Sequence, residues 1–202
     1  MNAQLHTLGL FFLSGYRERA FDYVHIFSKF LSFVMLVWVW NVIWKMVPDT
    51  VLADTPYDIA NLTYYVAMTE AIIFCSAYLF NEMDADIKSG NIGPSLIRPV
   101  SYHLRSLANW YGKALGIFTV FYPLALFAGF IITGVWVPNI LMVFLSLFMM
   151  LCSFFCFVCL NYIIGTLGFW IGDARPAYWI GQKLAFLFGG LLFPLTLYPD
   201  VL

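Results

Sequence analysis

The stretch ALGIFTVFYPLALFAGFIITGVWVPNILMVFLSLFMMLCSFFCFVCLNYIIGTLGFWIG, residues 114–172, contains no Asp, Glu, Lys or Arg. A helix needs about 20 apolar residues to cross the hydrocarbon core of a bilayer, so this stretch is too long for one span and suits two. Near its middle, the turn sequence Gly134-Val-Trp-Val-Pro-Asn139 combines a glycine and a proline with a tryptophan suited to a membrane interface. We therefore expect two membrane helices, over about residues 109–135 and 140–171.

The composition of the whole chain agrees with a membrane protein. Of its 202 residues, 62% are hydrophobic and only 10% are charged, and the mean hydropathy is +0.85. Soluble domains carry about one quarter charged residues, which this chain lacks. The net charge of −1, without a basic stripe that would neutralise phosphates, also argues against a nucleic-acid partner.

Three further apolar segments complete the predicted set of spans. They cover about residues 25–47, 60–80 and 178–198, and the last contains Gly189, Gly190 and Pro194, which favour a bend. Because backbone polar groups in lipid must be satisfied internally, each span is expected to be helical. The sequence thus predicts an all-α integral membrane protein with five transmembrane helices.

The distribution of basic residues predicts a cytoplasmic N-terminus. With that orientation, nine of the ten Lys and Arg residues fall on the cytoplasmic side and only Lys45 lies outside. Such a bias is typical of the positive-inside rule. The nine residues are Arg17, Arg19, Lys29, Lys88, Arg98, Arg105, Lys113, Arg175 and Lys183.

The N-terminal segment, residues 3–20, favours an amphipathic helix at the membrane interface. Leu5, Leu8 and Phe12 share one side, and polar residues such as Arg17 are available for the other. A frayed tail is the alternative.

The loop between the second and third predicted spans, residues 81–107, is expected to be cytoplasmic and to contain a short helix. Asn81 is a candidate N-cap, acidic residues follow it in the opening turns, and Gly90 is a candidate end of the helix. Ser101 is placed to cap the third membrane helix. The pattern fits either a helix that a soluble partner grips or an ordinary solvated loop.

The same loop resembles a known family. The run from Ile87-Lys-Ser-Gly90 through Leu96-Ile-Arg98-Pro99-Val-Ser101-Tyr102 is similar to the signature between the second and third helices of bacterial ABC-2-type permeases, in which a glycine-containing turn precedes Leu-Leu-Arg-Pro-Val-Ser. The similarity extends over nearly the whole chain, including Phe193-Pro-Leu and Tyr198-Pro199 near the fifth span. Ile97 replaces the more usual leucine.

The resemblance implies the permease half of an ABC exporter. Such a subunit would pair with a second copy or a sister permease in the bacterial cytoplasmic (inner) membrane and dock two ATP-binding subunits. It also implies that residues 82–98 are the coupling helix. The candidate coupling residues are Glu82, Asp84, Asp86, Ile87, Lys88, Gly90, Leu96 and Arg98.

Two expectations follow about what the chain itself contains. The family has six helices, whereas this sequence ends at Leu202 after the fifth, so we expect either a truncated chain or a protein that lacks one helix of its relatives. No G-x-x-x-x-G-K-[ST] motif is present, so no cofactor is expected in this chain, and ATP and Mg²⁺ are expected in a partner ATPase.

Polar residues inside the predicted spans form a second candidate site. Glu70 falls in the middle of the second span, where a charge costs several kcal/mol, about 3 by insertion scales, unless it faces protein or water. Asn41 and Asn161 are candidate partners from other spans. The set fits either a translocation path or a structural polar network.

Other chemistries have weaker support. Cys152, Cys156 and Cys159 share one helix face, which permits a soft-metal site, but no His or carboxylate flanks them and no metal is expected. The three histidines are scattered, so no catalytic cluster is apparent and an enzyme is not expected. The alternative to an exporter is a channel, scaffold or assembly protein that works without an ATPase.

Overall fold

The computed structural model describes residues 2–48, 56–76, 79–97, 100–190 and 194, and the regular structure in this part of the chain is helical. The helices in chain order are α1 (Asn2–Ala20), α2 (Tyr23–Met46), α4 (Ile59–Ser76), α5 (Leu79–Lys88), α6 (Ile92–Leu96), α7 (Tyr102–Thr133), α8 (Ile140–Thr166), α9 (Gly168–Ile171) and α10 (Arg175–Phe188).

Four helical stretches are long and apolar enough to cross a membrane. They are Tyr23–Met46, Ile59–Lys88, Tyr102–Thr133 and Ile140–Ile171. Four of the five predicted spans therefore have a helical counterpart, and the turn between the last two follows Gly134, which ends α7 in the left-handed conformation with φ of 72°.

The boundaries of the loop differ in part from the prediction. The helix that contains the third predicted span begins at Tyr102, before residue 109, because it continues through polar residues that hydropathy excludes. Ser101 takes the N-cap position as predicted, but its side chain makes no capping hydrogen bond. The loop predicted over residues 81–107 is correspondingly shorter. Asn81 lies inside α5 and does not cap it, since α5 already begins at Leu79.

The fifth predicted span is only partly covered by described residues. Helix α10 begins at Arg175, with a proline in its first turn, and ends at Phe188 before Gly189. Its 14 residues extend about 21 Å at 1.5 Å per residue, less than the roughly 30 Å hydrocarbon core. Most of the remaining predicted span, up to residue 198, lies outside the described residues, so a fifth span stays a prediction.

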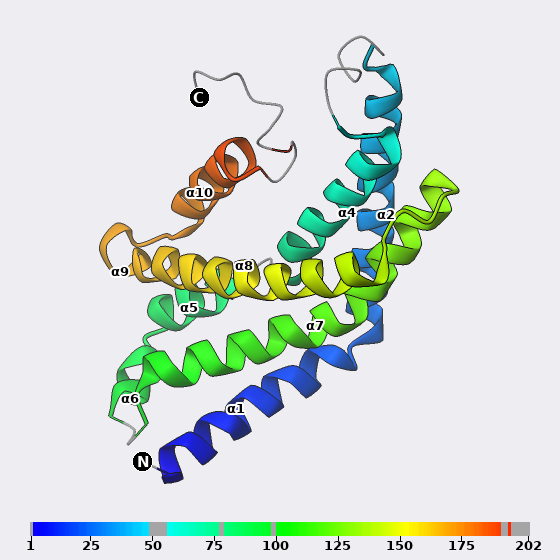
Figure 1. Ribbon diagram of the computed structural model, residues 1–202. Coiled ribbons are helices and arrows are strands. Elements are labelled where there is room, and N and C mark those ends of the chain that lie inside the picture. The colour runs from blue at the N-terminus through cyan, green and yellow to red at the C-terminus, as the bar shows by residue number, and fades with distance from the viewer. Residues whose placement is uncertain (1, 49–55, 77–78, 98–99, 191–193, 195–202) are drawn as a thin grey trace.

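Helix α1 lies along the first half of α7, and the two backbones approach closely (Figure 1). A Cβ added at Gly112 would lie 2.1 Å from the carbonyl oxygen of Phe12, and one added at Gly15 would lie 2.3 Å from that of Asn109. Small residues permit such close packing of membrane helices. The helix expected over residues 3–20 is present, and it is packed against the bundle along its length.

Helices α2, α4 and α7 share an aromatic core. The ring centroid of Phe33 lies 5.3 Å from that of Phe121 and 5.7 Å from that of Phe74, both in edge-on geometry. The second half of α7 turns upward beside α2 and α4 in Figure 1, and α7 contains Pro123 in its interior. A proline inside a helix removes one backbone hydrogen bond and is a common cause of a bend.

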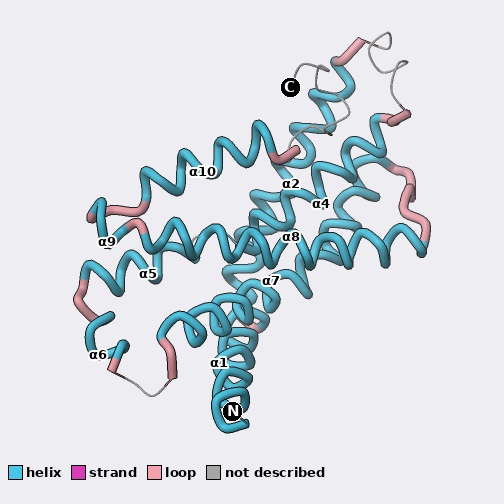
Figure 2. The backbone as a smooth tube through the Cα atoms, turned by 60° about the vertical axis from the view of Figure 1, so that its left-hand side comes forward, coloured by secondary structure: helices cyan, strands magenta, loops and turns pink. Residues whose placement is uncertain are grey.

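Helix α8 crosses the bundle between α7 and α10 (Figure 2). Much of its apolar surface is exposed. Phe144, Phe148 and Phe155 are more than half exposed. Exposed aromatic side chains on a membrane helix face lipid or another subunit.

Substituting Gly112 tests the close contact between α1 and α7. We expect Gly112→Ala to destabilise the protein by about 1–3 kcal/mol, because the new methyl group would meet backbone atoms that cannot turn aside. Gly9→Ala is the matched control in α1, since nothing lies within 4 Å of an added Cβ there. Thermal unfolding of the detergent-purified protein, followed by tryptophan fluorescence, measures both; equal melting temperatures for the two variants would contradict the described packing.

Candidate functional site

The predicted coupling region contains two short helices, α5 and α6, joined by an exposed turn. Glu82 lies in the first turn of α5 and Lys88 in its last turn, so both charges interact favourably with the helix dipole. Gly90 follows with φ of 73°, a conformation that favours glycine, and this agrees with the predicted end of the helix. The acidic residues of α5 contact three different parts of the fold.

Glu82 connects α5 to α7. Its Oε1 accepts a hydrogen bond from Lys113 Nζ at 2.8 Å, and its Oε2 accepts one from Trp110 Nε1 at 2.7 Å. Lys113 is 8% exposed, and its ammonium also lies 3.2 Å from Oε1 of Glu18 in α1. One buried ammonium therefore joins α1, α5 and α7.

Asp84 connects α5 to the turn before α10. It is 6% exposed, and its Oδ1 accepts a hydrogen bond from the backbone N–H of Ala174 at 3.1 Å. Its Oδ2 lies 2.5 Å from Lys88 Nζ, which is also 3.1 Å from Oδ1 of Asp173. The Arg175 guanidinium and, to a smaller extent, the Lys88 ammonium hold the pKa of the Asp173 carboxyl well below its usual range. We call the charged groups of Glu18, Glu82, Lys113, Asp84, Lys88 and Asp173 the ionic junction.

The other two predicted coupling residues of α5 also face the fold. Asp86 accepts a hydrogen bond from the Tyr102 hydroxyl at 3.1 Å, which joins α5 to the start of α7. Ile87 is partly buried against the main core. The acidic residues of the predicted coupling region thus all contact the bundle, although the Glu82 side chain stays partly exposed to solvent.

The exposed part of the region lies after α5. Ser89, Gly90, Asn91 and Ile97 are exposed, and the Ile97 side chain is 87% accessible. Of the remaining predicted coupling residues, Leu96 ends α6, and Arg98 lies outside the described residues. An apolar side chain so exposed beside a polar turn is a candidate contact for another protein.

The three polar residues predicted inside the spans are buried but are not brought together. Asn41 Nδ2 donates to Thr63 Oγ1 at 2.9 Å, and Asn161 Nδ2 donates to the carbonyl of Phe157 in its own helix. Glu70 is buried in α4 and lines a cavity between α2, α4 and α10. No hydrogen bond connects Glu70 with either asparagine in the described part of the chain, so the predicted network between them is not formed.

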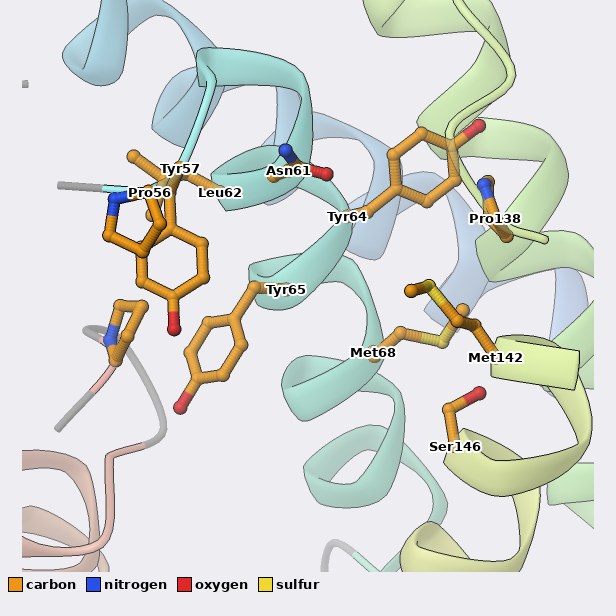
Figure 3. A pocket seen from close by; sticks show the side chains of 11 residues that line it. Pro56, Tyr57, Asn61, Leu62, Tyr64, Tyr65, Met68, Pro138, Met142 and Ser146 are labelled. Carbon is orange, nitrogen blue, oxygen red and sulfur yellow. The ribbon is translucent and has the colours of Figure 1, made fainter. Parts of the chain in front are cut away.

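A second cavity, of about 470 Å³, lies near the opposite end of α4 (Figure 3). Met68 of α4 and Met142 of α8 point toward one another in it, and Tyr57 and Tyr65 line the other side. Among the described residues that line this cavity there is no Asp, Glu, Lys, Arg or His. Its aromatic and thioether surface suits an apolar or flat molecule.

The described residues do not gather a cluster of metal ligands. No group of three or more His, Cys, Asp or Glu side chains among them could hold a metal ion. Cys152 and Cys156 are exposed on α8, and His103 contacts the hydroxyl of Tyr162.

Sequence reasoning missed half of the ionic junction. Lys113 carries the last charge before the charge-free stretch, and a charge at such a place is expected to pair with a carboxylate. Its partners, Glu18 and Glu82, are far away in sequence. Asp173 similarly ends that stretch. A charge that borders a long apolar segment is the signal that identifies both residues.

The fold defines the class of this protein: in its described part it is all-helical, and it has four helices fit to cross a membrane. Comparison with protein-family models, with curated proteins and with solved structures found no match for the chain.

A double-mutant cycle tests the ionic junction. We expect Glu82→Gln and Lys113→Met each to destabilise the protein, and their coupling free energy to be about 1 kcal/mol, because Glu82 is partly solvated. Thermal or denaturant unfolding of the single and double variants measures it. Additive effects of the two changes would show that the two charges do not interact.

Proposed function

We propose that the chain is the membrane-spanning permease subunit of an ABC exporter and that separate ATP-binding subunits dock on the turn after α5. The observation that supports this proposal best is the ionic junction, which joins the predicted coupling helix to α1, α7 and the turn before α10. A helix so connected would transmit force to several parts of the bundle.

The proposed mechanism begins at residues 89–97, which comprise the turn after α5, the short helix α6 and Ile97. This segment offers an apolar contact at Ile97 beside exposed polar residues, as a soluble partner requires. ATP-driven closure of two partner ATPases would push on this turn and on α5. Because Glu82 holds Lys113 and Asp84 holds the backbone of Ala174, α7 and α10 would shift with α5.

The other components would come from other chains. ATP and Mg²⁺ would bind in the partner ATPases, and the permease would pair with a second copy or a sister permease in a bacterial cytoplasmic membrane. The exposed aromatic side of α8, with Phe144, Phe148 and Phe155, offers an apolar surface for that pairing or for lipid. The resemblance of residues 87–102 to ABC-2-type permeases supports the same assignment.

The proposal is tested by the composition of the complex. The tagged chain, purified from its native membrane, should bring with it a P-loop ATPase that mass spectrometry identifies. We expect Ile97→Asp to reduce the recovered ATPase about tenfold, because a charge would replace a central apolar contact.

Asn91→Asp is the matched control, since it adds the same charge at an exposed position of the same turn. It should leave recovery nearly unchanged. A chain that folds, inserts and carries no ATPase would favour the channel, scaffold or assembly protein instead.

A further inference from the structure

Residues of helices α2, α4 and α10 line an open cavity of about 440 Å³ whose wall carries two opposite charges, Glu70 from α4 and Lys29 from α2. Glu70 is 3% exposed, and no described residue forms a hydrogen bond or an ion pair with its carboxyl group. Lys29 Nζ donates to the carbonyl oxygen of Phe74 at 2.6 Å, and no described carboxylate lies within ion-pair distance of it. The cavity thus presents a buried acid and a base that do not neutralise one another.

Unpaired charges at such a place are costly. A carboxylate or an ammonium within the membrane is stable only when it faces water, a counter-charge or hydrogen-bonding groups. Since Glu70 and Lys29 line one cavity but do not pair, a molecule that carries both an ammonium and an anionic group would compensate both charges at once.

The rest of the wall favours an amphiphile over a bare ion. Gln182 contributes an amide from α10, while Leu36, Phe74 and Phe186 are apolar. A volume of about 440 Å³ falls within the roughly 300–1,000 Å³ of small-molecule sites. Mg²⁺ or Ca²⁺ needs about six oxygen ligands, whereas among the described residues of this wall Glu70 alone contributes a carboxylate.

The depth of Lys29 also suits a lipid. Lys29 lies about 9 Å along the axis from the first residue of α2, at 1.5 Å per residue. Its contact with the carbonyl of Phe74 places it one helical turn from Glu70 along α4. The Lys29 ammonium is therefore near one border of the hydrocarbon core, within reach of a headgroup phosphate.

We propose that this cavity binds the headgroup of a zwitterionic amphiphile, as in phosphatidylethanolamine, with its ammonium on Glu70 and its phosphate on Lys29. A primary ammonium has three N–H donors, which match the Glu70 carboxylate and the amide oxygen of Gln182. The acyl chains lie outside, against the apolar surface of α2, where Leu31 and Met35 are exposed.

Lipid binding to the purified, delipidated chain tests the proposal. Native mass spectrometry measures the occupancy of phosphatidylethanolamine and of phosphatidylglycerol, which lacks the ammonium. We expect the wild type to prefer phosphatidylethanolamine about tenfold, Glu70→Gln to remove that preference, and Lys29→Met to weaken both lipids about tenfold. Glu70→Asp keeps the charge and should keep the preference.

Two matched controls each remove a charge of the same sign outside the cavity. They are Asp58→Asn, just before α4, and Lys45→Met, in the last turn of α2, and neither should change the lipid occupancies. Equal effects of Glu70→Gln and Asp58→Asn, or an unchanged preference in Glu70→Gln, would overturn the proposal. If Glu70→Gln does not purify as a folded protein, Gln182→Leu tests the same wall and should lower phosphatidylethanolamine occupancy about threefold.

The free headgroup separates a lipid from a small soluble zwitterion. Millimolar phosphoethanolamine should fail to displace the lipid, because it lacks the acyl chains; displacement would overturn the amphiphile assignment. No ATPase takes part in these measurements, so their failure would leave the proposed exporter function untouched, and a missing ATPase would leave this site untouched.

Discussion

The arrangement of the described helices depends on the buried ammonium of Lys113. Lys113 lies within α7, directly before the charge-free stretch. Its buried charge is stable there only because carboxylates approach it from two other helices. Glu18 comes from α1 and Glu82 from α5, so one charge holds together segments that are distant in sequence. The close glycine-mediated contact of α1 with α7 brings Glu18 within reach.

The same constraint explains why α5 lies within the fold. An amphipathic helix with Glu82, Asp84 and Asp86 could remain in solvent, yet each of these carboxylates has a partner on another element. The surface left for another protein is consequently the turn after α5 and not α5 itself. In the proposed exporter, α5 would transmit force while the turn receives it.

The spans could be predicted from the sequence because lipid allows few charges over a fixed length. Four helical stretches overlap predicted segments, although the second continues to Lys88, past the predicted end near residue 80, and the turn at Gly134 was predicted for a physical reason. Hydropathy placed the start of α7 too late, since a helix that leaves the membrane keeps its hydrogen bonds and continues through polar residues such as Arg105.

The candidate sites were harder to predict than the spans. Glu70 could be singled out because an acid within a span is rare, but its neighbours Lys29 and Gln182 come from helices whose packing no local pattern encodes. Asn41 and Asn161 were predicted as its partners on polarity alone, and each bonds elsewhere. Long-range ion pairs such as Lys113 with Glu82 are set by tertiary packing, which a single sequence does not show.

Hydrogen–deuterium exchange of the membrane-embedded chain tests most directly whether α5 is more firmly held by the bundle than residues 89–97, which include only the short helix α6. Amides of residues 82–88 are hydrogen-bonded in a helix whose charges are held by α1, α7 and the turn before α10, so they should exchange much more slowly than those of residues 89–97. Glu82→Gln should bring the two rates closer together. Exchange of residues 82–88 as fast as that of residues 89–97 in the wild type would contradict the account.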